Sequence, residues 1–138
     1  MAVTLNPYLS FRDNAREAME FYHSVFGGEL TLSTFGEMGG SPDPAEAAKV
    51  MHAQLAGPDG LTLMGADTPN AMPLAPASSI SVSLSGSAAD DATLRGYWTA
   101  LLVGGSLTVP LEVAPWGDAF GMLTDRFGTA WMVNISAQ

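Results

Sequence analysis

The 138-residue sequence contains no cysteine, so a thiol nucleophile, a disulfide framework and a thiolate metal site are all excluded. Basic residues are also scarce, because 5 Lys and Arg stand against 14 Asp and Glu and the net charge is −9. Nucleic acids and anionic membrane surfaces both attract clustered basic side chains. We therefore expect neither of them as a partner.

Long hydrophobic runs are missing too. No stretch approaches the roughly 20 apolar residues of a membrane span, and the first residues, MAVTLNPYLSF, lack the basic flank and apolar core of a signal peptide. These features predict a cytoplasmic protein that does not contact a membrane. Hydrophobic residues make up 47% of the chain, which is enough for one compact domain with its own core.

Two amphipathic helices are predicted. In residues 14–26, apolar side chains recur at helical spacing, Asn14 and Glu17 are placed like a capping box, and two glycines follow as a stop signal. A second helix is predicted at 88–102, with Ser87 as its N-cap.

Each helix follows one short strand pattern and precedes three more, which predicts the order βαβββ twice. The strand patterns occupy 7–11, 29–35, 49–56 and 61–66, and then 79–85, 106–113, 119–124 and 130–135. A shift of 68 positions aligns similar residues of the two halves, which indicates a duplicated module. The matches are Leu55 with Leu123, Gly60 with Gly128, Leu63 with Trp131, and Met64 with Met132.

We predict an α+β fold in which 1–138 is a single domain. Its two modules cover 5–67 and 79–136. The segment 68–78 is rich in Pro and Ala and has no periodicity, which predicts a linker.

Two strand patterns separate polar from apolar side chains with period two. His52 and Gln54 share one side of their strand, whereas Ala53 and Leu55 lie on the other. We expect the apolar side to pack under a helix, which leaves His52 and Gln54 on the opposite face.

The pattern SSISVSLS behaves in the same way. Ile80, Val82 and Leu84 form one side of the strand, and three serines form the other. The serines are Ser79, Ser81 and Ser83. They face either a cavity or solvent, and the alternation alone leaves both interpretations open.

The stretches PYLSFRDNAREAMEFYHSVFGGEL, MHAQL and WGDAFGMLTDRFGTAWMVNI together resemble the glyoxalase/bleomycin-resistance, or vicinal-oxygen-chelate, superfamily, and more narrowly its PhnB-like branch. The resemblance implies two βαβββ modules whose curved mixed sheets enclose a cavity. It also implies a homodimer, because modules of these proteins often pair across subunits.

In the catalytic members of this superfamily, one divalent metal is held by four side chains, one from the first and one from the last strand of each module. Those side chains are His, Gln or Glu. The resemblance places Pro7, Met64, Ser79 (or Ser81) and Met132 at these positions. Proline has no donor atom, serine is a poor ligand and a thioether prefers soft metals. We therefore predict no cofactor and no metal at this place, with a divalent metal elsewhere left open.

The cavity implied by the resemblance has a mixed lining. The 68-residue shift pairs His52 with Phe120 and Gln54 with Met122, and Trp116 stands just before the Phe120 strand. The predicted ligand-binding residues are Gln54, Met64, Ser79, Ser81, Ser83, Trp116, Phe120, Met122 and Met132. Trp131 is assigned to the core because it alternates with Met132.

Acid–base chemistry would depend on His52, with Glu112 as its candidate partner and Glu37 and Asp118 as further carboxylates. A hydrogen-bonded structural histidine explains His52 equally well. The other histidine, His23, lies just outside the apolar stripe of its helix and is interpreted as exposed.

Three functions remain open. The first is binding of a small, partly apolar molecule without the usual metal. The second is a lyase, isomerase or dioxygenase with a site relocated to His52. The third is sequestration of a bleomycin-type drug, for which the charge of −9 is compatible. Some PhnB-like proteins are linked by name to ubiquinone methylation, but no Gly-rich strand-to-helix turn offers a site for a nucleotide-like cofactor.

Overall fold

The computed structural model describes residues 3–38, 44–74 and 79–137. The chain divides into two compact units, Met1–Pro76 and Ala77–Gln138. The boundary falls inside the predicted linker 68–78. Each unit has its own sheet and its own long helix. The assignment of the whole chain to a single domain stays a prediction.

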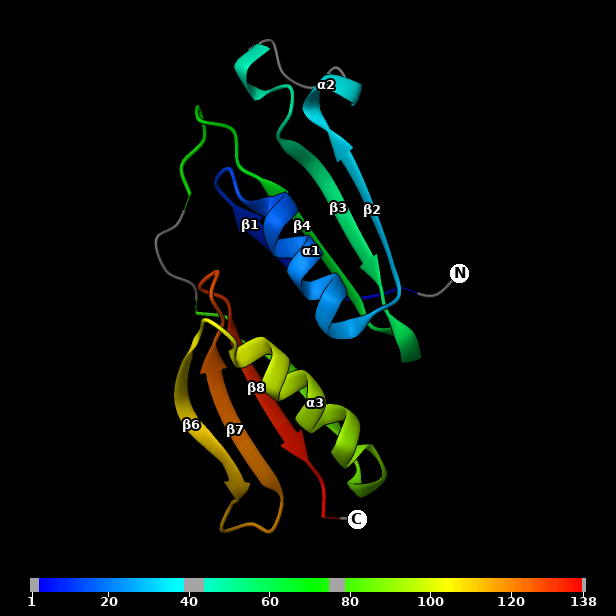
Figure 1. Cartoon of the computed structure of the whole chain (residues 1–138), viewed down its shortest axis with the longest axis vertical. Coiled ribbons are helices and arrows are strands. Elements are labelled where there is room, and N and C mark those ends of the chain that lie inside the picture. Colours follow the sequence, from blue (N-terminus) through cyan, green and yellow to red (C-terminus); the bar gives the residue numbers. More distant parts are fainter. Residues whose placement is uncertain (1–2, 39–43, 75–78, 138) are drawn as a thin grey trace. The chain divides into compact units, whose positions relative to one another are not determined.

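The first unit contains one four-stranded mixed sheet covered by one long helix. Its strands lie in the order β1-β4-β3-β2, with β1 parallel to β4 and the other neighbours antiparallel. Figure 1 shows α1 lying across this sheet. The elements are β1 (Tyr8–Phe11), α1 (Ala15–Phe26), β2 (Glu29–Thr34), α2 (Phe35–Met38), the 3-10 helix η1 (Pro44–Glu46), β3 (Val50–Ala56), the 3-10 helix η2 (Pro58–Gly60) and β4 (Thr62–Asp67).

The second unit repeats this topology. Its strand order is β5-β8-β7-β6, with β5 parallel to β8. The elements are β5 (Val82–Gly86), the 3-10 helix η3 (Ala88–Asp90), α3 (Asp91–Leu102), β6 (Ser106–Val113), β7 (Ala119–Thr124) and β8 (Ala130–Ile135). The predicted α+β fold with βαβββ twice is confirmed.

The two hairpin turns before the last strands confirm the 68-residue repeat. The Gly57 amide donates to the Leu61 carbonyl (2.8 Å), and the Asp125 amide donates to the Thr129 carbonyl (2.9 Å). Both turns contain a glycine in the left-handed region, with φ of 78° at Gly60 and 89° in its counterpart. A side chain there would strain the backbone, so both turns need glycine.

The helix starts differ from each other in how they are capped. Ser87 and Asp90 form a reciprocal capping box ahead of α3, which confirms Ser87 as the N-cap residue, with the first turn being the 3-10 helix η3. The capping box predicted for Asn14 and Glu17 is wrong, because the Asn14 side chain makes no cap hydrogen bond. A residue distant in sequence, Asp67, accepts a hydrogen bond from the Ala15 amide instead (2.9 Å).

The start of the fifth strand also differs from the prediction. The strand begins at Val82 rather than at Ser79, and Ile80 is 73% exposed. Within the strand the predicted alternation holds, since Leu84 is buried and Ser83 is exposed. Ser79 and Ser81 therefore precede the hydrogen-bonded part of the sheet, where strand pairing no longer sets the direction of their side chains.

Each unit has a core between its helix and one sheet face. In the first unit Met19 and Tyr22 of α1 are fully buried, together with Ala53 of β3. In the second unit Trp131 is 1% exposed, and its indole Nε1 donates to Asp125 Oδ2 (2.8 Å). The core assignment of Trp131 is confirmed.

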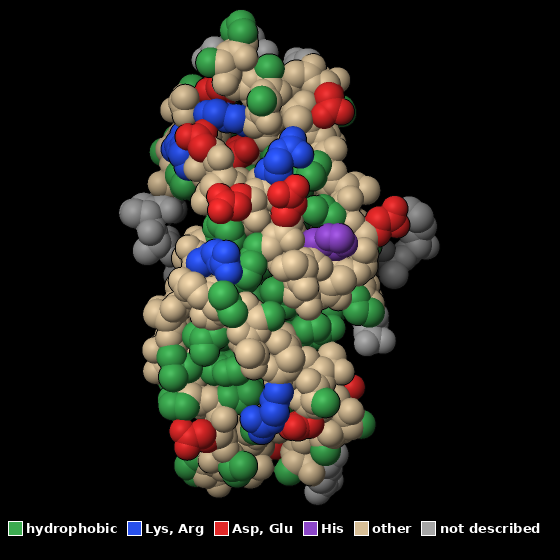
Figure 2. Space-filling model, in the orientation of Figure 1, with side chains coloured by type: hydrophobic (Ala, Val, Ile, Leu, Met, Phe, Trp, Pro, Cys, Tyr) green, Lys and Arg blue, Asp and Glu red, His purple; other side chains and the backbone are tan. Residues whose placement is uncertain are grey.

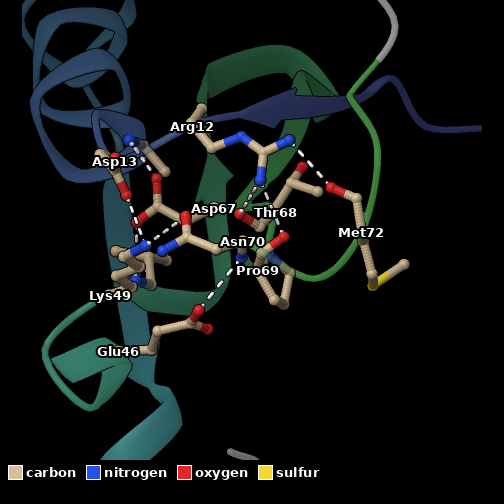
Figure 3. Close-up of polar contacts among 11 residues, drawn as sticks. Arg12, Asp13, Glu46, Lys49, Asp67, Thr68, Pro69, Asn70 and Met72 are labelled. Atoms are coloured by element: carbon tan, nitrogen blue, oxygen red, sulfur yellow. Dashed lines mark hydrogen bonds and ion pairs between the residues drawn. The ribbon is translucent and has the colours of Figure 1, made fainter. Parts of the chain in front are cut away.

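The first part of the predicted linker is fastened to the first unit (Figure 3). The Arg12 guanidinium donates to the backbone carbonyls of Thr68, Pro69 and Met72 at 3.4, 2.9 and 2.9 Å. The buried Glu46 carboxylate accepts from the Asn70 amide (3.1 Å). Residues 75–78 of the predicted linker lie outside the described residues. No helix in the described parts of the chain is both long and apolar enough to cross a membrane.

Asp67 connects three elements of the first unit. Its Oδ1 accepts from the Ala15 amide at the start of α1, and its Oδ2 accepts from the Val50 amide at the start of β3 (2.9 Å each). The carboxylate is 5% exposed, so its removal leaves two amides without an acceptor away from water.

Asp67→Ala should therefore lower the free energy of unfolding by about 2 to 4 kcal/mol, and Asp67→Asn by less, because an amide oxygen still accepts one of the two bonds. Urea denaturation measures both values. The control is Asp91→Asn, which breaks an exposed ion pair with Arg95 and should cost less than about 1 kcal/mol. Equal losses at Asp67 and Asp91 would contradict this role of Asp67.

Candidate functional site

In the first unit, polar and thioether side chains gather on the sheet face opposite α1. Tyr8 is the register partner of Met64, Met64 of Gln54, and Gln54 of Thr31, so these four residues form one row across all four strands. Register partners point to the same side of a sheet. The structure therefore brings the predicted residues Gln54 and Met64 together.

His52 lies two residues before Gln54 on the same strand. Both side chains are half-buried, whereas Ala53 and Leu55 between and beyond them are buried, so the predicted alternation is confirmed. The Tyr8 hydroxyl is 3.3 Å from Nδ1 of His52, and the two ring centroids are 5.8 Å apart. Burial raises the pKa of the Tyr8 hydroxyl above its ordinary value of 10.0.

In the second unit, the corresponding face is more apolar. One row consists of Ser83, Met132, Met122 and Val109. The next row consists of Ser85, Asn134, Phe120 and Glu112. The structure thus places four predicted ligand-binding residues and the candidate partner base on one sheet face.

Trp116 lies in the turn between β6 and β7. Its indole is 63% exposed and contacts Phe120 edge-on, with 5.7 Å between ring centroids. The pair forms an aromatic rim beside the row that contains Phe120. A flat apolar group would find a stacking partner there.

The strand register corrects two positions that the resemblance had implied. Tyr8, not Pro7, is the register partner of Met64 and shares its sheet face. Pro7 lies just before the strand, and its backbone carbonyl accepts a hydrogen bond from the Met64 amide (3.0 Å). Ser83, not Ser79 or Ser81, is the register partner of Met132.

The four corrected positions are therefore Tyr8, Met64, Ser83 and Met132. They offer a phenol, two thioethers and a hydroxyl, none of which is a good ligand for Mg²⁺, Mn²⁺ or Zn²⁺. Among the residues that the structure describes, no three His, Asp or Glu side chains are grouped in a way that could hold a metal ion. The side chains present do not fit the superfamily's divalent metal.

Glu37, Asp118 and the second histidine each have a hydrogen-bond partner of their own. Glu112 is exposed and belongs to the second unit, whereas His52 belongs to the first. Glu37 accepts from the Thr34 amide and hydroxyl at the start of α2. Asp118 accepts from the Asn134 amide group (3.2 Å). His23 is exposed, as predicted, and its Nε2 is 3.1 Å from the Gly28 carbonyl.

Two depressions lie on the helix side, away from the predicted residues. A cleft of about 540 Å³ in the first unit is crossed by the Lys49–Asp13 ion pair (2.7 Å), which raises the pKa of Lys49. Figure 2 shows acidic and basic side chains mixed over this region of α1. A groove of about 270 Å³ in the second unit lies between Trp98 of α3 and Leu111 of β6.

Sequence reasoning missed two polar residues on the sheet faces. Tyr8 was overlooked because its strand was aligned one residue too early. Asn134 was overlooked because it sits inside an apolar run, AWMVNI. Phe11 and Ile135 are buried under the helices. Strict alternation along each strand from these residues would have placed Tyr8 and Asn134 on the sheet face opposite the helix.

Duplicated βαβββ units, each with parallel first and last strands, define the fold of the glyoxalase/bleomycin-resistance/dioxygenase superfamily. The glyoxylase/bleomycin resistance protein/dioxygenase domain from Frankia sp. EAN1pec shares this fold, with a TM-score of 0.65 and 16% identity over 100% of this chain and 94% of that one.

Within this superfamily, the sequence pattern of the 3-demethylubiquinone-9 3-methyltransferase family matches residues 3–134. The chain belongs to this PhnB-like family. Protein PA1353 from Pseudomonas aeruginosa is 39% identical, with a TM-score of 0.84 over 99% of this chain and 100% of that one. Protein YjdN of Escherichia coli K12 is 29% identical over 97% of this chain and 96% of its own. The PhnB protein from Bacillus cereus is 23% identical, with a TM-score of 0.72 over 97% of this chain and all of its own.

The raised pKa of Tyr8 has a consequence for stability at high pH. Because the folded state disfavours the phenolate, this contribution to stability is present below about pH 10 and is lost as the pH rises further. The unfolding free energy of the wild type should therefore fall more steeply above about pH 10 than that of Tyr8→Phe.

Urea midpoints measured across this pH range test the difference. Ser10→Ala, on the same strand and exposed, is the matched control and should keep the wild-type slope. Identical slopes for the wild type and Tyr8→Phe would contradict the assigned environment of Tyr8.

Proposed function

We propose that the protein binds a small, partly apolar molecule against the sheet faces opposite its helices, and that it does so without the superfamily's four-ligand metal site. The observation that carries this proposal is the donor set at the four register positions. Tyr8, Met64, Ser83 and Met132 replace the His, Gln or Glu that a divalent cation needs.

The same side chains suit an organic ligand. Met122 and Met132 are direct cross-strand partners in the second unit, and both are half-buried. Thioether side chains are flexible and polarisable, so they adapt to apolar ligands of different shape. Trp116 and Phe120 add aromatic surface next to them.

Methyl transfer, named in the description of the family, receives less support. A nucleotide-like cofactor usually binds at a helix N-terminus that follows a glycine-rich turn. In this chain α1 follows Asp13-Asn14, and its first amide is already bonded to Asp67. A cofactor of that kind would have to displace a buried carboxylate.

The second candidate function is an enzyme of the same fold with its acid–base group at His52. The Tyr8–His52 hydrogen bond of 3.3 Å favours it, because an oriented imidazole can transfer protons. Drug sequestration rests only on the net charge of −9. A cytoplasmic location and a homodimer complete the proposal. Exposed Leu107 and Val113 on the edge strand β6 support the homodimer, because a partner would remove them from water.

Metal analysis tests the proposal most simply. Protein purified without chelators should contain far less than one equivalent of Zn, Ni, Mn or Fe per chain, because the sheet faces offer no suitable donor set. Adding each ion should also leave the melting temperature unchanged, since a ligand that binds only the folded state would raise it. One tightly held ion per chain, with a matching rise in melting temperature, would contradict the proposal.

A further inference from the structure

The two central rows of the non-helix face of the first unit carry no formal charge, although the chain as a whole has a net charge of −9. Eight side chains from four strands form these two rows, and Glu29 lies in the next row, where it pairs with Ala56. The eight are Tyr8, Ser10, Thr31, Ser33, His52, Gln54, Met64 and Ala66. None is Lys, Arg, Asp or Glu, and seven carry a polar or thioether group. The two central rows are therefore polar but uncharged.

The Tyr8–His52 contact bridges this face. β1 and β3 both pair with β4, and Tyr8 is level with Gln54 rather than with His52, so Tyr8 and His52 stand diagonally about 12 Å apart at the backbone. The phenol and the imidazole point toward each other and close this gap. The small Ala66 side chain of β4 leaves room for them, and the result is the 3.3 Å contact between the Tyr8 hydroxyl and His52 Nδ1.

Two polar groups on this face are left for a ligand. Within the described residues, His52 Nε2 and the Gln54 carboxamide have no hydrogen-bond partner, and both side chains are half-buried. They stand two residues apart on one strand, about 7 Å at the backbone. Met64 lies next to Gln54 and supplies an apolar surface between β1 and β3.

We propose that His52 Nε2–H and the Gln54 carboxamide bind the oxygen of a neutral ligand, a carbonyl or hydroxyl compound with an apolar body, while Tyr8 acts as the positioning residue that fixes the imidazole. This inference rests on the proposed function, because it names the ligand class for one of the two sheet faces.

Charge decides the ligand class. A carboxylate or phosphate on this face would lose water without gaining a Lys or Arg partner, and the net charge of −9 would repel it. An ammonium group held between His52 and Gln54 would find no carboxylate in these two rows, because Glu29 lies one row further along β2. A neutral oxygen needs only the hydrogen bonds that His52 and Gln54 offer.

The role of Tyr8 follows from its proton. A phenol O–H is a stronger donor than the N–H of a neutral imidazole, and the imidazole nitrogen is the better acceptor, so we assign Tyr8 as the donor in this contact. With Nδ1 of His52 as that acceptor, the ring proton resides on Nε2. Tyr8 therefore turns His52 into a fixed hydrogen-bond donor.

The tautomer can be measured without any ligand. The chain contains only two histidines, so ¹⁵N-histidine spectra of the full protein show two rings, which His23→Gln assigns. At about pH 8, above the ordinary histidine pKa of about 6.5, His52 should show the Nε2–H tautomer. Tyr8→Phe should convert it to a mixture and leave His23 unchanged. The Nδ1–H tautomer in the wild type, or no response to Tyr8→Phe, would overturn the role of Tyr8.

Four probes of similar shape test the ligand class: acetophenone, benzoate, ethylbenzene and 1-phenylethylammonium. Titrations followed by the backbone amide signals of β3, which every variant retains, should show acetophenone binding at least about tenfold more tightly than the others, since one hydrogen bond is worth roughly that factor. His52→Gln or Gln54→Leu should remove most of this preference. His23→Gln should retain it.

The outcomes separate this inference from the proposed function. Equal binding of acetophenone and ethylbenzene, unaffected by His52→Gln, would overturn the polar contact and leave apolar binding intact. Preferred binding of benzoate or of the cation, or no response to any probe, would overturn the ligand class. Stoichiometric zinc binding at His52 would contradict the proposed function itself.

Discussion

Parallel pairing of the first and last strands fixes which side chains share a sheet face in each unit. In the first unit Tyr8 stands beside Met64, and in the second Ser83 stands beside Met132. Side chains alternate along a strand, so a slip of one residue would exchange the two faces. The donor set, the bridge from Tyr8 to His52 and the absence of charge from the two central rows of the first face all follow from this register.

The two units share a backbone plan but differ in how buried carboxylates complete it. In the first unit Asp67 joins the starts of α1 and β3. In the second, Asp125 holds its own hairpin turn by accepting from the amides of Phe127 and Thr129 and from the Trp131 indole. The two units thus share local features such as the glycine turns, while their long-range polar contacts differ. The two sheet faces differ as well, since one offers hydrogen bonding and the other thioether and aromatic surface.

Local patterns predicted most of the fold, because helix spacing, strand alternation and turn glycines depend on neighbouring residues. The last three strands of the second unit have their predicted limits. The predictions failed where a residue distant in sequence determines the local structure. At the start of α1, for example, Asp67 and not Asn14 accepts the first helix amide. For the site, His52, Gln54 and Met132 lie on the expected faces. Alternation from Phe11 gives the face of Tyr8, but not its pairing with Met64, because short parallel strands carry little sequence signal for their register.

Register is therefore the feature on which the proposed site depends most, and the absence of native cysteine makes it measurable by paired substitution. Oxidation should close a disulfide in Tyr8→Cys with Met64→Cys and in Ser83→Cys with Met132→Cys, because register partners lie within bridging distance. Pro7→Cys with Met64→Cys and Ser79→Cys with Met132→Cys should stay reduced under the same conditions, as peptide mass analysis would show. Preferential bridging from positions 7 and 79 would place a different pair of residues beside the methionines and contradict the assigned register.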